Sequence, residues 1–226
     1  MIVVLWATMA KSELVGAMDG LQQRLTPWLR QRGFRKHGRT LNRTTSEGLT
    51  HVVGFQMGSF DPPGTTYISG LRENLYGRFT VNLGIYVPEV ARHQGSGEAK
   101  KIIHDYNCCI RSRLGRGANS SERWWTISSS DALVDEIRRL LEAEAIPLFR
   151  RFERRDQILA EFGNQADNNN LIAVPRIVCA LILLERGKRD AAQRLLALQA
   201  RDQTRNPGHA AYVMDLARRL GIDISS

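Results

Sequence analysis

Cysteine is scarce in this sequence, and its scarcity excludes one class of protein. The 226 residues contain three cysteines, Cys108, Cys109 and Cys179. Two of them are adjacent, and adjacent cysteines rarely bridge because the required geometry is strained. The chain therefore lacks the disulfide framework typical of small secreted domains. Reduced cysteines fit a reducing compartment, so we expect a cytoplasmic protein.

The sequence also lacks a long apolar run. Residues 1–10 are mostly apolar, but no basic region precedes them, as a secretory signal would require. The run is also far shorter than the roughly 20 apolar residues that span a bilayer. We predict no membrane partner, and an alternative first residue at Met9 or Met18 stays open.

Acidic residues are outnumbered by basic ones. The chain has 23 Asp and Glu against 32 Lys and Arg, which gives a net charge of +9 and a pI near 10.0. A basic balance favours an acidic partner, either a protein surface or a nucleic acid. A hydrophobic content of 42% still allows a substantial core.

Recognisable catalytic and metal-binding motifs are absent. The five histidines lack metal-ligand spacing, and no Cys-x-x-Cys pair, nucleophile elbow or phosphate-binding glycine loop occurs. One alternative is Cys108 or Cys109 as a nucleophile with His104 as its base. Four or five residues along one strand would separate such groups by more than ~13 Å. We therefore predict no catalytic residue, no metal and no cofactor, and rank a hydrolase or transferase third.

The strongest pattern that is present lies at residues 78–87. Phe79, Val81, Leu83, Ile85 and Val87 alternate with more polar residues, which predicts a strand with one apolar and one wetter face. Pro88 then ends the strand. We expect a partner to bind on the wetter face.

Other segments complete an antiparallel sheet. Residues 34–43 and 49–57 read as a hairpin, 106–113 as a fourth strand and 123–127 as a fifth, and residues 58–77 read as a loop.

Helical periodicity appears at residues 11–32 and 132–152, with Asp131 as an expected N-cap and Pro147 expected to bend the second helix. Four further helices are expected at 154–162, 174–184, 190–200 and 206–221.

This order predicts an α+β fold. An antiparallel sheet of about five strands is flanked by N-terminal and central helices and followed by a small C-terminal helical bundle. We place the α+β domain at residues 1–153 and the bundle at residues 154–226.

Several polar and aromatic residues on these strands are candidates for binding a partner. Two arginines spaced by two on one strand can clamp a carboxylate or phosphate, or simply cover apolar surface with their stems. Amides on neighbouring strands can form a ladder that meets a partner, or satisfy nearby loop backbone. Of two adjacent tryptophans, one is expected in the core and the other at an interface. The candidates are Arg39, Gln56, Asn82, Arg111, Arg113, Trp124 and Trp125.

Nucleic acid is the alternative partner. The basic set Arg35, Lys36, His37, Arg39 and Arg43 contains no acidic residue and would suit phosphates. The same charges also suit a solvated edge strand that resists aggregation.

Five segments together resemble one bacterial family, that of the domain of unknown function 4304. They are residues 33–40 (GFRKHGRT), 53–57 (VGFQM), 79–85 (FTVNLGI), 109–115 (CIRSRLG) and the pair at 124–125 (WW). The resemblance covers residues 18–152. It implies an α+β domain and supplies no catalytic residues. Because some members resemble immunity proteins, it implies that the chain neutralises a cognate toxin by occluding it. The basic balance of this chain would suit a toxin with an acidic surface.

Overall fold

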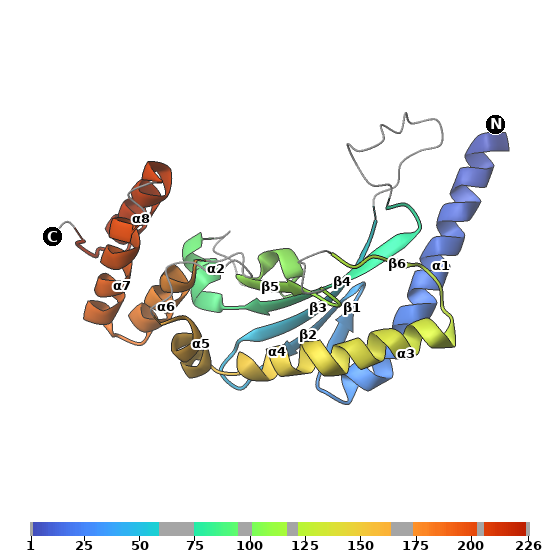
Figure 1. Ribbon diagram of the computed structural model, residues 1–226, viewed down its shortest axis with the longest axis horizontal. Helices are drawn as coiled ribbons and strands as arrows, with labels where there is room; N and C mark the ends of the chain where they lie inside the picture. Colours follow the sequence, from blue (N-terminus) through green and yellow to red (C-terminus); the bar gives the residue numbers. More distant parts are fainter. Residues whose placement is uncertain are drawn as a thin grey trace. The chain divides into compact units, whose positions relative to one another are not determined.

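The computed structural model describes residues 2–58, 75–94, 101–116, 122–163, 174–202 and 206–224, with side chains from residue 13 onward (Figure 1). The elements of its sheet half are α1 (Ile2–Arg30), β1 (Arg35–His37), β2 (Thr40–Thr44), β3 (Thr50–Met57), β4 (Arg78–Tyr86), α2 (Pro88–Gln94), η1 (Asp105–Asn107), β5 (Ile110–Arg113) and β6 (Trp125–Thr126). Helical elements follow: α3 (Asp131–Leu140), η2 (Leu141–Ala145), α4 (Ile146–Arg151), α5 (Arg155–Phe162), α6 (Pro175–Glu185), α7 (Arg189–Asp202) and α8 (Pro207–Arg219). The predicted α+β class is confirmed.

The strand order in the sheet is β1-β2-β3-β4-β5, and β6 also pairs with β4. The segment predicted as one strand at residues 34–43 is in fact the hairpin β1–β2, in which His37 pairs with Thr40. Gly38 makes this two-residue turn possible because it adopts a positive φ of 58°, which other residues rarely do.

The fourth and fifth strands are shorter than predicted. Residues 105–107 form a 3-10 turn, in which the amide of Cys108 donates to the carbonyl of Asp105 at 3.0 Å, so β5 begins only at Ile110. β6 is two residues long, and its Trp125 pairs with Phe79 of β4.

Both faces of β4 are buried, which corrects the expectation of an open, wetter face. Phe79, Val81 and Leu83 are at most 2% exposed, as their alternation predicted. Thr80 and Asn82, on the opposite face, are 0% and 5% exposed. Alternation reports side-chain polarity, but a buried amide is tolerated when it is hydrogen-bonded, as Asn82 is.

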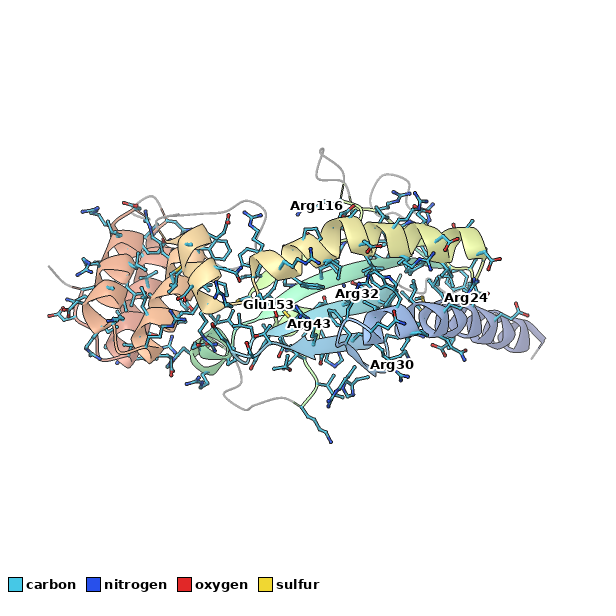
Figure 2. All side chains as sticks on the ribbon, turned by 90° about the horizontal axis from the view of Figure 1, so that it is seen from below. Arg24, Arg30, Arg32, Arg43, Arg116 and Glu153 are labelled. Atoms are coloured by element: carbon cyan, nitrogen blue, oxygen red, sulfur yellow. The ribbon has the colours of Figure 1, made fainter. Side chains whose placement is uncertain are left out.

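Helices α1 and α3 lie side by side over one face of the sheet (Figure 2). α1 begins earlier than predicted, at Ile2, and continues through Pro27. Its buried stripe contains Met18, Leu21, Leu25 and Leu29. Gly33, with φ +86°, follows its end as expected.

The second long helix differs from its prediction both at its start and near Pro147. The Ser130 hydroxyl, and not Asp131, caps α3 by accepting from the amide of Leu133. The five residues of η2 then form a π-helical segment that ends two residues before the proline. A π segment widens the helix where proline would otherwise clash with the preceding turn and leave a carbonyl unbonded.

The chain divides into two compact units. The first consists of Met1–Arg43, Val52–Leu83 and Ser112–Leu148, and the second of Thr44–His51, Gly84–Arg111 and Phe149–Ser226. The expected domain boundary at residue 153 stays a prediction.

Within the second unit, α6 packs on α7 and α7 on α8. Their starts follow the sequence signals: Pro175 opens α6, and Asn206 caps α8 by accepting from the amide of His209. No helix in the described ranges combines the length and the apolar character needed to cross a membrane.

Candidate partner-binding site

A chain of hydrogen-bonded side chains crosses three neighbouring strands. Asn82 on β4 donates through Nδ2 to Oε1 of Gln56 on β3, at 2.9 Å. Arg113 on β5 donates through Nε to Oδ1 of the same asparagine, at 3.1 Å. We call Gln56, Asn82, Arg113, Glu122 and Trp124 the sheet-face cluster.

The hydrogen bonds of this cluster run in one direction. A guanidinium can only donate, so the asparagine must present its oxygen to Arg113 and its nitrogen to Gln56. Gln56 then accepts through its oxygen, and its Nε2 group becomes the donor end of the chain. Gln56 is exposed, whereas Asn82 is only 5% exposed. The cluster therefore offers a fixed hydrogen-bond donor to an approaching molecule.

Arg113 also contacts two residues that follow β5. It forms an ion pair with Glu122 and lies over the ring of Trp124, with its guanidinium carbon 5.7 Å from the ring centre. The Arg113 side chain remains 26% exposed. Sequence reasoning missed Glu122, because no local pattern predicts that this residue pairs with Arg113 of β5.

Thr80 lies two residues before Asn82 and so on the same face of β4. Its hydroxyl is fully buried and has no hydrogen-bond partner within the described part of the chain. A buried hydroxyl without a partner costs free energy. This threonine was not among the predicted site residues.

Trp125 belongs to the core and not to an exposed surface. It is 6% exposed, and its ring lies 5.6 Å from that of Phe79, centre to centre. Its Nε1 donates to Glu136 at 3.1 Å, so the polar end of the indole is satisfied. Of the two tryptophans, Trp124 is the partly exposed one.

The other two predicted residues, Arg39 and Arg111, have separate surroundings. Arg111 forms an ion pair with Asp105 at 3.2 Å. Arg39 follows Gly38 in the β1–β2 turn and lines a groove against α1. The structure thus joins Gln56, Asn82, Arg113 and Trp124 in one cluster. Whether any of the seven binds a partner stays a prediction.

The cysteines do not have the surroundings of nucleophiles. Burial raises the pKa of Cys109 to about 12 and that of Cys108 well above its ordinary value. The thiol of Cys108 faces the backbone carbonyl of His104 at 3.5 Å, while the His104 ring stacks on Tyr106. Among the described residues, no group of three His, Cys, Asp or Glu is placed to hold a metal ion.

The sequence pattern of one family, the domain of unknown function DUF4304, matches residues 25–151. This match spans more than half of the chain. The protein belongs to the DUF4304 family. The matched range of this DUF4304 chain contains all five members of the sheet-face cluster. Comparisons with curated proteins and with solved structures found no significant match.

Proposed function

We propose that this DUF4304 protein is an immunity-type binding protein that occludes a cognate toxin in the bacterial cytoplasm. The observation that carries the proposal is the sheet-face cluster. Its buried amide and its partly exposed arginine are already held by hydrogen bonds before any partner arrives.

Such an arrangement suits binding more than chemistry. Side chains fixed in advance lose little conformational entropy on association, which improves affinity. Arginine and tryptophan are both enriched at interface hot spots. In this cluster the guanidinium of Arg113 lies over the ring of Trp124.

The net charge supports the choice of partner. At +9, the protein would attract an acidic surface over long distances and repel a basic one. The donor end at Gln56 would then pair with a carbonyl or carboxylate oxygen of the toxin.

The test is protection in cells. The reading frame next to this gene is expressed in a heterologous host, alone and together with this protein. We expect growth inhibition by the first and relief by the second, with a stable complex in size-exclusion chromatography. Asn82→Ala and Arg113→Ala should weaken protection. Arg116→Ala, which removes an exposed arginine three residues after Arg113, should not.

Two results would contradict the proposal. One is a harmless neighbouring product, or protection unaffected by both cluster variants while they remain folded. The other is binding of DNA or RNA at micromolar concentration in physiological salt, falling steeply as salt rises, which would favour the nucleic-acid alternative.

A further inference from the structure

A groove runs between α1 and the β1–β2 turn, on residues that the sheet-face cluster does not use. Its volume is about 770 Å³, within the range of roughly 300–1,000 Å³ that is usual for ligand pockets. α1 contributes Asp19, Gln23 and Arg30 to its lining, and the hairpin contributes Lys36 and Arg39. We call it the cationic groove.

The cations of this groove differ from two nearby arginines, one on α1 and one just after its end. Arg24 forms an ion pair with Asp131, and Arg32 one with Glu142 at 3.2 Å. Figure 2 shows both between α1 and α3, with Arg30 on the other side of α1. Over the described ranges, neither Arg30, Lys36 nor Arg39 forms an ion pair with a carboxylate.

In the described lining three cations outnumber one carboxylate, that of Asp19, so the cations repel one another and an anion relieves that repulsion. Two of the three are arginines, whose planar fork matches a carboxylate in two hydrogen bonds. The groove therefore has the chemistry of a site for carboxylate oxygens.

The rest of the groove favours a peptide over a nucleic acid. No aromatic side chain is among the described lining residues, so a base would find no ring on which to stack. Pro27 lacks an N–H, so the carbonyl of Gln23, a lining residue, loses the i+4 amide donor that a helix normally supplies.

The length of the groove sets the length of its occupant. From Asp19 to Arg30 the helix advances about 16 Å. An extended chain covers that distance in about five residues.

We infer that the cationic groove binds an extended segment of about five residues whose carboxylates meet Arg30, Lys36 and Arg39. The proposal rests on the proposed function in one respect, namely that the segment would belong to the same acidic partner. The binding chemistry itself does not depend on that partner.

The experiment uses the full chain and a fluorescein-labelled hexaglutamate peptide. Anisotropy is measured at 50 and 150 mM salt, with hexalysine and a ten-residue oligothymidine as the other probes. The groove variant is Arg30→Gln with Lys36→Gln and Arg39→Gln. The matched control carries the same loss of charge elsewhere, at the exposed residues Arg35, Arg139 and Arg194, each changed to Gln.

We expect hexaglutamate to bind the wild-type chain, at least tenfold more weakly to the groove variant, and within twofold of wild type to the control. Amide chemical shifts of the ¹⁵N-labelled wild-type chain should change at Gln23, Thr26 and Gly38. That mapping keeps the test valid should the triple variant fail to fold.

Three results would overturn the inference: no binding of hexaglutamate, an equal loss in groove and control variants, or tighter binding of oligothymidine that the groove variant abolishes. A failed peptide assay alongside successful protection in cells would remove the groove proposal and leave the immunity proposal standing. Peptide binding at the groove without any protection in cells would do the reverse.

Discussion

The sheet-face cluster and the cationic groove use the same residue type in opposite ways. In the cluster, Arg113 is bonded to Asn82, paired with Glu122 and placed over Trp124. In the groove, Arg30 and Arg39 line one surface without a carboxylate partner in the described residues.

This difference shows that a basic protein can use its arginines either for stability or for attracting a partner. A bonded arginine contributes to stability and fixes geometry, so it favours specificity and slow dissociation. An arginine without a carboxylate partner contributes little to folding stability. It speeds association with an acidic partner, and added salt reduces this effect. We therefore expect that removing a cation lowers the free energy of unfolding less when that cation makes fewer hydrogen bonds and ion pairs.

The largest loss is expected at Arg155, which bonds to α2 and to the turn between β2 and β3. Its Nε donates to the carboxylate of Glu89, which is 3% exposed, and its side chain also reaches the carbonyl of Glu47. Arg155→Ala would strand a buried carboxylate, so the free energy of unfolding should fall by about 3 kcal/mol or more. Urea denaturation measures this. Arg154→Ala, next to it and exposed, should change the value by less than about 0.5 kcal/mol.

An intermediate loss is expected at Arg113. Arg113→Ala removes the donor to a buried amide oxygen of Asn82 and should cost about 1–3 kcal/mol. A double-mutant cycle with Asn82→Ala should give a coupling of at least about 0.5 kcal/mol. Additive single effects would show that the two side chains act independently.

A smaller, pH-dependent loss is expected at Arg151, which donates to Glu161 at 2.9 Å on the surface. This hydrogen bond lowers the pKa of the Glu161 carboxyl. The pair therefore adds stability above the ordinary pKa of glutamate, and that stability disappears as pH falls through the lowered value. Arg151→Gln should flatten the acid side of the stability profile by less than about 1 kcal/mol. An unchanged slope on the acid side, below the ordinary pKa of glutamate, would contradict this.

The smallest effect on stability is expected in the groove. Replacing Arg30, Lys36 and Arg39 by Gln removes no ion pair within the described ranges and relieves mutual repulsion. The free energy of unfolding should stay within about 0.5 kcal/mol of wild type or rise slightly. A loss of several kcal/mol would mean that these cations are bonded in the folded protein. The contrast with the bonded Arg113 would then be wrong.

Much of the fold could be predicted because local signals decided it. Strict alternation predicted β4, proline and asparagine placed the starts of α6 and α8, and Gly33 marked the end of α1. The approach of Gln56 and Asn82 could be foreseen as well, since both fall on neighbouring strands of the predicted sheet.

What could not be predicted depends on packing between distant segments. The burial of Thr80 and Asn82 is set by what covers the second face of β4, which polarity does not report. The π-helical segment before Pro147 is one of several ways to accommodate a proline. The groove arises only when a stripe of α1 meets a turn at the sheet edge, so no single stretch of sequence carries its signal.

The hydrogen bonds of the sheet-face cluster run in one direction, so they respond to the replacement of the Asn82 amide by a carboxylate. Deamidation of Asn82 to aspartate would leave a carboxylate, which only accepts. Gln56 would then have to rotate its amide by half a turn and donate to it, so that its oxygen would become the outward atom. A change at a residue that is itself only 5% exposed would thus invert the polarity of the surface that a partner meets.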